Sequence, residues 1–493
     1  MSNHQTGRIW RLRLPLSACN HIMQPFKRYT LQLQNTGELT MISRKTSVIS
    51  PVLCASDKGH LSSKHIQIAP LLIKKLLPLA CLFGFSTALA QPVALTGARI
   101  IDGTGAAEIY PGTLIMDQGK IIAIGSTTDI QIPEGAQVIA LEGKTLMPGL
   151  VNAHGHAGGV RGLESGHYSE ENLLRQLSLY ASYGVTSVVS LGDDEEAGFR
   201  LRDTQNHADL DRARLFVAGP VLNPATAAQA LELVDQTAAL KPDFIKIRVD
   251  DNLGRTPKMP AEVYEAVSAR ADTHGIPLSV HTYYQQDTKD LLRAGADHVA
   301  HSIRDSHIDD EFIQLMRARD ICYTPTLTRE LSTYVYESEP AFFSDPFFLA
   351  GVEADVLSIL REPERQQRMA QNAAAQQYKA ALPVAMTNLK TLSDAGVRIA
   401  MGTDSGPAAR FQGYFEHLEM WMMQDAGMTP MQIIKSATAD AAACMNLSDT
   451  GTLETGKWAD LLVLGQNPLE DIHNTRSIEQ VWIAGNQLRR PRF

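Results

Sequence analysis

The chain has 493 residues, which is enough for one large domain together with a smaller one. Its apolar content of 44% is that of an ordinary globular protein. The formal net charge of −9 gives no sign of a basic surface, so the composition argues against a nucleic-acid partner.

A targeting signal follows a long leader at the N-terminus. Residues 1–70 are polar and mildly basic, and we interpret them as a disordered leader or as a start placed too early. Residues 71–90 combine Lys74-Lys75, a short apolar run and an Ala-x-Ala site, the pattern of a secretory signal peptide. The run is too short for a comfortable transmembrane helix, and an uncleaved anchor is the alternative. We therefore expect a periplasmic or secreted protein with no membrane contact after cleavage.

Cleavage of this signal would leave Cys322 and Cys444 as the remaining cysteines. Two cysteines far apart in the sequence do not make a disulfide scaffold. Export permits a bridge between them without requiring one, so the pairing stays open at this point.

Short β-rich pieces flank a long middle region. Residues 91–147 and 449–493 contain short apolar runs separated by turn residues such as Asp102-Gly103. We expect these two flanks to form one small β-sandwich domain. Its expected strands are Ala98–Asp102, Gly112–Asp117, Lys120–Ile124, Gln137–Leu141, Ala459–Leu464 and Ile478–Ile483.

The middle region, residues 148–448, alternates expected strands with helical patterns such as Ala261–His274 and Gln286–Ala294. The strands are rich in Val, Ile and Leu, which is typical of buried parallel strands. Eight strand–helix repeats predict the α/β class and a (β/α)8 TIM barrel. The expected strands are Leu146–Ala153, Thr186–Leu191, Arg214–Ala218, Phe244–Val249, Leu278–Thr282, His298–Ser302, Cys322–Leu327 and Arg398–Thr403.

A long connection, residues 329–395, separates the last two expected strands. Its first half is rich in aromatic residues, and its second half is a Gln- and Ala-rich helical stretch. Long loops in barrels often form lids or substrate walls. A helical hairpin that packs on the barrel is an equal alternative.

Residues of metal-ligand type stand near the ends of five expected strands, where barrel active sites form. The first two are separated by one residue, and on a strand such positions point to the same face. Each residue alone has an ordinary explanation, such as a hydrogen-bonded histidine, a paired lysine or a helix-capping aspartate. Together on one rim they predict a metal centre. The set is His154, His156, Lys246, His281, His301 and Asp404.

These motifs resemble the amidohydrolase superfamily, especially its imidazolonepropionase-like and prolidase-like members. The resemblance covers roughly residues 93–488, and the motifs are specific for the superfamily but poorly specific for substrate. The matching segments are Pro148-Gly149-Leu150 with His154-Gly155-His156, the strand from Asp243 to Ile247, Val280-His281, Ala300-His301, Gly402-Thr403-Asp404 and the tail from Gly451 to Leu462.

The resemblance implies a centre of two divalent metal ions, zinc for preference. One ion would be held by His154, His156 and Asp404, and the other by His281 and His301. Lys246, carboxylated by carbon dioxide, would bridge both ions, because a carbamate is an anionic oxygen ligand whereas an ammonium repels cations. A single ion with Lys246 as an ordinary cation is the alternative.

The resemblance also implies a hydrolytic mechanism. The metal lowers the pKa of a bound water and polarises the substrate carbonyl. Asp404 would take a proton and pass it to the leaving nitrogen. Tyr283, in preference to its neighbour Tyr284, would stabilise the developing oxyanion, unless both tyrosines only line the wall of a substrate site.

Two arginines beyond the candidate ligands could bind a substrate carboxylate. Arg304 follows the sixth expected strand, and Arg248 faces the same way as the lysine if its strand continues. Arginine binds carboxylates with two hydrogen bonds. A salt bridge to Asp250, Asp251 or Asp305 is an equal alternative for both arginines.

The acidic run Asp193-Asp194-Glu195-Glu196 is interpreted as a solvated loop rather than a site for a cationic substrate. The sequence thus predicts an exported, metal-dependent hydrolase of the amide bond of a dipeptide or an N-acyl amino acid. One alternative is a cyclic amide or amidine hydrolase or a deaminase, against which export argues mildly. Another is a metal-binding protein without turnover, against which the intact ligand set argues. The expected partner is a small molecule or short peptide, and assembly into a homo-oligomer stays open.

Overall fold

The computed structural model describes residues 29–33, 39–43 and 91–489. The chain divides into two compact units, Met1–Phe85 and Ser86–Phe493. In the first unit, β1 (Tyr29–Leu33) pairs antiparallel with β2 (Leu39–Ser43), and the sequence analysis predicts neither strand. The rest of the predicted leader and the predicted signal peptide lie outside the described residues.

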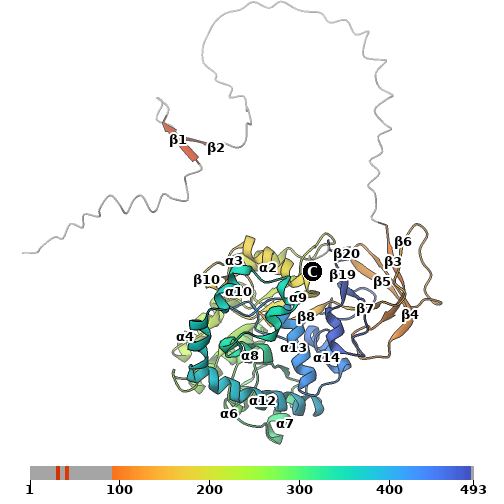
Figure 1. The fold of residues 1–493 in the computed structure, drawn as a ribbon. Coiled ribbons are helices and arrows are strands. Elements are labelled where there is room, and N and C mark those ends of the chain that lie inside the picture. The colour runs from red at the N-terminus through yellow and green to blue at the C-terminus, as the bar shows by residue number, and fades with distance from the viewer. Residues whose placement is uncertain (1–28, 34–38, 44–90, 490–493) are drawn as a thin grey trace, which may run out of the picture. The chain divides into compact units, whose positions relative to one another are not determined.

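Strands from both flanks of the middle region join in one mixed sheet. They are β3 (Val93–Ile100), β4 (Ile109–Asp117), β5 (Lys120–Ser126), β6 (Gln137–Ala140), β7 (Thr145–Pro148), β18 (Leu461–Leu464), β19 (Ile478–Ile483) and β20 (Asn486–Gln487). Their order is β20-β19-β18-β7-β3-β4-β5, with β6 paired to β3 (Figure 1). Antiparallel pairing of β7 with β18 joins the two flanks, as expected, whereas the β-sandwich arrangement stays a prediction.

The predicted strand Leu146–Ala153 is two strands in the structure. Its first part is β7 of the flank sheet, and its second part, β8 (Leu150–Gly155), begins the parallel strands of the middle region. Gly149 separates the two, and a Cβ atom there would lie 2.1 Å from Thr186 Oγ1. Only glycine permits so close an approach of the two segments.

The middle region holds two parallel sheets, of order β12-β11-β8 and β13-β14-β15-β16-β17. On one side Asp243 N–H donates to the carbonyl of Val217 and so connects them. On the other side the irregular segment before residue 402 lies between them: the carbonyl of Met401 accepts Ala153 N–H, and Ala400 N–H donates to the carbonyl of Tyr323. The predicted eighth strand is an irregular segment, represented by a bridge between Ile399 and Tyr323. The strands are β11 (Val185–Ser190), β12 (Arg214–Val217), β13 (Val221–Leu222), β14 (Ile245–Arg248), β15 (Leu278–His281), β16 (His298–Ala300) and β17 (Cys322–Thr324).

Helices surround these sheets, and two short strands, β9 (Val160–Arg161) and β10 (Glu164–Ser165), pair beside them. The predicted helical patterns at Ala261–His274 and Gln286–Ala294 are confirmed. The helices outside the long connection are α2 (Glu170–Ser182), α3 (Glu196–Asp203), α4 (Ala227–Ala239), α5 (Ala261–His274), α6 (Gln285–Ala294), α7 (Asp310–Ala318), α13 (Tyr414–Asp425), α14 (Pro430–Ser436) and α15 (Ala439–Cys444). Among the residues that the structure describes, no helix combines the length and apolar character needed to span a bilayer.

The long connection between residues 329 and 395 folds into short helices and one long helix. Its aromatic half packs into the core, since Tyr336, Phe343 and Phe348 are each 1% exposed. The Gln- and Ala-rich half forms the predicted helix, α12. The helices are α8 (Leu327–Ser332), α9 (Pro346–Leu349), α10 (Ala354–Leu360), α11 (Pro363–Ala370) and α12 (Ala373–Asp394). The aromatic half of the connection therefore packs on the rest of the fold, as the second alternative predicts. Helix α12 also extends to the candidate site described below.

A disulfide joins Cys322, at the start of β17, to Cys444, at the end of α15. The two Cα atoms lie 5.8 Å apart although the residues are separated by 122 positions. The sequence leaves this pairing open because only the packing of α15 against the strands brings the two cysteines together.

We expect the double variant Cys322→Ser/Cys444→Ser to lose about 4 kcal/mol of unfolding free energy. The bond closes a long loop and so restricts the unfolded chain. Urea unfolding of oxidised wild type, reduced wild type and the variant measures this. The reduced wild type should match the variant, and equal midpoints for oxidised and reduced protein would contradict the prediction.

Candidate metal centre

The six predicted ligands come together at one edge of the parallel strands. Five of them stand on the carboxyl-terminal part of a strand or directly after a strand or the irregular eighth segment, which is where sites of such folds form, and Lys246 is the second of the four residues of β14. His154 lies in β8 and His156 directly after it. The others are Lys246 of β14, His281 of β15, His301 after β16, and Asp404.

Three of them form the tightest group. One ligand atom from each of His154, His156 and Asp404 lies within 4.8 Å of the other two. Asp404 Oδ1 is 3.0 Å from His156 Nε2 and 3.9 Å from His154 Nε2. His154 Nδ1 is buried without a hydrogen-bond partner. Two imidazoles and a carboxylate, with an unsatisfied buried nitrogen among them, fit a divalent ion such as zinc.

Two further imidazoles extend this group. The ring centroid of His301 is 4.7 Å from that of His154 and 4.2 Å from that of His281. His301 Nδ1 lies 2.9 Å from Thr326 Oγ1, and His281 Nε2 lies 2.9 Å from Asp250 Oδ2. Such partners orient an imidazole and leave its other nitrogen free for a metal.

Burial keeps most of these imidazoles neutral. It lowers the pKa of His281 to about 3, despite the hydrogen bond with Asp250. Burial, with the nearby positive charges, also holds the pKa of His154 and His301 well below the usual value. For His156 the effect of burial is outweighed by the hydrogen bond with Asp404, which raises its pKa. Neutral imidazole is the form that binds metals.

Lys246 is buried without a counter-ion. It is 3% exposed, and its Nζ contacts Ser279 Oγ at 3.5 Å. In the described part of the chain it forms no ion pair with a carboxylate. Burial lowers its pKa to about 7. An isolated buried ammonium is costly, so the surroundings do not fit the ordinary paired lysine that is common in barrel strands.

Two of the ligands have left-handed backbone conformations. The φ angle is 77° at His301 and 54° at Asp404, and it is 49° at Thr326, the hydrogen-bond partner of His301. Residues other than glycine seldom adopt such angles. Strained backbone of this kind concentrates at functional sites and persists only where surrounding contacts hold it.

Two buried glutamates of α13 provide such contacts. Glu416 Oε1 accepts hydrogen bonds from Asn152 Nδ2 at 2.6 Å, Thr403 Oγ1 at 2.7 Å and Ser405 Oγ at 2.6 Å. Asn152 Oδ1 accepts the backbone N–H of the first histidine. Glu416 thus links the segments of two ligands. One turn further along, Glu419 accepts the backbone N–H groups that open α8, each at 2.7 Å.

We expect Glu416→Gln to weaken metal binding by about tenfold or more, because the amide nitrogen that replaces Oε2 cannot accept the backbone N–H of Gly413, which Oε2 accepts at 2.6 Å. Competition with a chelator measures the metal affinity, and circular dichroism shows whether the variant folds. Glu265→Gln, at an exposed position of α5, is the matched control and should bind metal like the wild type. Unchanged affinity in folded Glu416→Gln would refute the prediction.

Among the predicted substrate residues, Arg248 forms the alternative salt bridge. Its side chain is 40% exposed, and its Nη2 lies 3.3 Å from Asp250 Oδ2. Tyr284 donates its hydroxyl hydrogen to Asp251 Oδ1 at 2.9 Å. Tyr283 is buried and lies 4.7 Å from the Tyr284 ring, between centroids. The predicted roles of these residues toward a substrate stay predictions.

Arg304 pairs with Glu330, a carboxylate outside the predicted set. It is 2% exposed, and its Nε lies 2.8 Å from Glu330 Oε2. Its Nη1 donates to the carbonyl groups of Thr282 and Ser302. The salt bridges suggested from the sequence are therefore wrong for Arg304, because the nearest carboxylate comes from the long connection rather than from a neighbouring aspartate.

Three charged residues near Asp404 lie outside the predicted set. Arg410 Nη1 contacts Asp404 Oδ2, and Arg329 Nε lies 3.8 Å from the same oxygen. Glu330 pairs with Arg329. Arg329 and Glu330 follow β17 closely, so the rule that sites form at strand ends could have found them. Arg410 lies in a loop that carries no such signal.

The interpretation of Asp193 to Glu196 as a solvated loop is wrong for Asp194. This residue is 6% exposed, and its Oδ2 accepts the backbone N–H groups of Ala218 at 2.9 Å and Gly219 at 3.1 Å. Burial raises its pKa to about 7. Its carboxyl group ties the loop after β11 to the end of β12.

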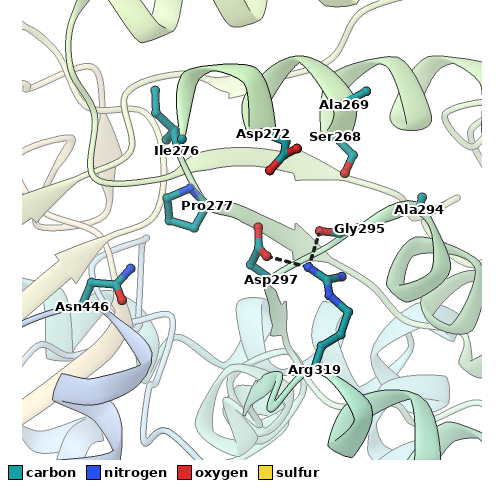
Figure 2. Close-up of a pocket in the computed structure, with 11 residues that line it drawn as sticks. Ser268, Ala269, Asp272, Ile276, Pro277, Ala294, Gly295, Asp297, Arg319 and Asn446 are labelled. Carbon is teal, nitrogen blue, oxygen red and sulfur yellow. Dashed lines mark hydrogen bonds and ion pairs between the residues drawn. The ribbon is translucent and has the colours of Figure 1, made fainter.

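Two cavities lie at opposite ends of the strands. A cavity of about 400 Å³ includes His156, with Tyr168 and Pro407 in its wall. Another, of about 480 Å³, is formed by residues that precede β15, β16 and β17. Figure 2 shows Arg319 of this second cavity bonded to Asp297 and to a backbone carbonyl. The second cavity contains no candidate ligand, whereas the first contains His156, so the first cavity is the candidate substrate site.

Comparison with known proteins identifies the family. Residues 145–488 match the amidohydrolase family. An ochratoxinase from Aspergillus niger is 25% identical over 520 residues, which cover 92% of this chain and 95% of that protein. An imidazolonepropionase from Streptomyces avermitilis is 32% identical over 107 residues, covering 21% of this chain and 25% of that one.

A solved structure of a Xaa-Pro dipeptidase with bound methionine shares the fold. The TM-score is 0.64 at 21% identity, and the match covers 81% of this chain and 100% of that one. The match to the family spans most of the chain and includes every candidate ligand. The resemblance inferred from the sequence motifs is thus confirmed. The chain belongs to the amidohydrolase family and is a hydrolase that acts on carbon–nitrogen bonds.

Proposed function

We propose that this hydrolase cleaves the amide bond of a dipeptide or an N-acyl amino acid at a centre of two divalent ions, zinc for preference. The observation that carries the proposal is the convergence of four imidazoles, one carboxylate and one unpaired lysine at one edge of the sheets. The two parallel sheets would close into a (β/α)8 barrel that positions these groups.

The donor groups divide naturally between two ions. The first would be held by His154, His156 and Asp404, and the second by His281 and His301. Lys246 would carry a carboxylate added by carbon dioxide and would bridge the two. Its buried position without an ionic partner supports this, since a carbamate would replace an unpaired positive charge by an oxygen ligand.

The protein groups around the ions would handle the protons and the substrate. When bound, divalent ions lower the pKa of water and polarise a carbonyl group. Asp404 would take up a proton and deliver it to the leaving nitrogen. Tyr283, which is 4% exposed, would donate a hydrogen bond to the developing negative charge on the carbonyl oxygen. Arg304, Arg248 and Tyr284 remain the substrate-binding residues proposed from the sequence.

The extent of similarity favours this proposal over ring opening, whereas deamination stays the alternative, because a 5-methylthioadenosine/S-adenosylhomocysteine deaminase from Caldicellulosiruptor saccharolyticus matches 80% of this chain at 21% identity. The similarity to the ochratoxinase extends over 92% of this chain, whereas that to the imidazolonepropionase covers 21%. A substrate panel of dipeptides, N-acyl amino acids, imidazolone-type rings and adenosine derivatives tests it on zinc-loaded protein. We expect turnover of dipeptides or N-acyl amino acids. Turnover of rings or nucleosides alone would refute the substrate class, and one zinc ion or fewer per fully active chain would refute the paired centre.

We also propose that the protein is exported after cleavage of the predicted signal peptide, residues 71–90. The disulfide between Cys322 and Cys444 supports this, because disulfides persist mainly in oxidising compartments. Mass spectrometry of the exported protein should find an N-terminus at or near Gln91. A mature chain that still contains the apolar run would refute the cleavage.

A further inference from the structure

The charged cluster beside Asp404 holds more positive than negative charge. Arg304 and Arg329 share one carboxylate, Glu330, at 2.8 and 2.9 Å. All three side chains are buried, with exposed fractions of 2%, 7% and 0%. The next carboxylate is Asp404, which already contacts Arg410 and belongs to the candidate metal centre. The cluster therefore holds three guanidinium groups, those of Arg304, Arg329 and Arg410, against two carboxylates, and buried charges are normally balanced.

Arg329 has one guanidinium edge without hydrogen bonds, and its Nε faces Asp404 Oδ2 at 3.8 Å. Its Nη1 donates to both oxygens of Glu330, at 2.9 and 3.0 Å, and these bonds fix the plane of the guanidinium. Its Nε is buried and has no hydrogen-bond acceptor. Its Nη2 donates to no group in the described chain. The Nε–Nη2 edge is the fork with which arginine binds a carboxylate through two parallel hydrogen bonds.

Aromatic rings enclose the same cluster. Tyr378, on α12 of the long connection, lies 5.2 Å from Arg329 and 5.7 Å from Arg304, measured from Cζ to ring centroid. The ring of Tyr283 covers Arg304 at 4.3 Å. Tyr378 also lines a cavity of about 340 Å³. These rings exclude water, which strengthens an ion pair formed among them.

We propose that Arg329 binds a carboxylate of the substrate through its Nε–Nη2 edge. This rests on the proposed function and adds the residue that recognises the substrate class. Arg329 Nε lies 3.8 Å from Asp404, the group that would deliver a proton to the leaving nitrogen. In an amino acid leaving group, one carbon atom separates that nitrogen from the carboxylate carbon. Arg329 therefore binds the carboxylate of the amino acid that is released as the amine product.

Matched substrates test this assignment. The enzyme is assayed with the best N-acyl amino acid of the panel and with its C-terminal primary amide, which lacks the negative charge. We expect kcat/KM to be about 100-fold higher for the acid, because hydrogen bonds to charged groups contribute a free energy of this size. Arg329→Gln should remove this preference by lowering kcat/KM for the acid and leaving the amide nearly unchanged. Arg317→Gln, at an exposed position of α7, is the control and should keep the preference.

The outcomes separate this inference from the proposed function. Equal turnover of acid and amide by the wild type would overturn the role of Arg329 while leaving the amidohydrolase proposal intact. An equal loss on both substrates in Arg329→Gln would do the same, because it indicates a structural role.

A binding measurement keeps the test decisive if no panel substrate is hydrolysed. N-acetyl-L-phenylalanine should raise the melting temperature of the wild type more than its primary amide does. Arg329→Gln should lose that difference, and Arg329→Lys, which keeps the charge without the fork, should retain part of it. No difference between acid and amide in the wild type would overturn the inference.

Discussion

Asp404→Asn is expected to lower kcat by about 1,000-fold while leaving the metal content near that of the wild type. The asparagine keeps an oxygen that can face the first ion, but it cannot accept and deliver a proton. Asp404 is 6% exposed and has one oxygen toward His156 and the other toward Arg410, so an isosteric replacement fits without a cavity.

Steady-state kinetics together with metal analysis of the same sample test this expectation. Asp425→Asn, at the exposed end of α13, makes the same chemical change away from the site and should leave kcat unaltered. Near wild-type turnover by Asp404→Asn would remove its role in proton transfer. Loss of the metal together with the activity would show that Asp404 acts chiefly as a ligand.

Lys246→Ala is expected to lose most of its bound metal and to lower kcat/KM by about 1,000-fold or more, since metal activation and the bridge would fail together. The substitution opens a space where the carboxylated side chain would lie. A short carboxylic acid such as propionate would supply an oxygen pair there and restore part of the activity. The unmodified lysine has Ser279 as its neighbour and no carboxylate, so loss of an ion pair cannot account for the effect.

Activity is measured with increasing propionate and with propanol as the neutral control. Lys390→Ala, at a partly exposed position of α12, should match the wild type and show no response to propionate. Full metal content and activity in Lys246→Ala would refute the bridging role. A loss of activity that propionate leaves unchanged would show that the carbamate itself is not what the site requires.

The ligands could be predicted because their signals are local. His154 and His156 are one residue apart on a strand, and the other ligand types recur where later apolar runs end. A parallel sheet brings those ends to one edge without any knowledge of side-chain packing. The same rule also applies to the first turn of α8, which follows β17 and contains Arg329.

The rest depends on contacts between distant segments. Asp194 stands among exposed acidic neighbours, and its burial follows from two backbone N–H groups at the end of another strand. The pairing of Cys322 with Cys444 requires α15 to lie against β17. The predicted eighth strand, Arg398–Thr403, forms only a bridge at Ile399, because an apolar run does not reveal that its backbone is irregular.

Two glutamates of the same helix, α13, hold two separate parts of the site in place by hydrogen bonds. Glu416 carries the loop of Asp404, and Glu419, three positions later, carries the opening of α8, which leads to Arg329. A tilt of this single helical turn would displace the proton carrier and the guanidinium fork in concert. Substitutions elsewhere in the protein that shift α13 would therefore alter turnover and substrate affinity together.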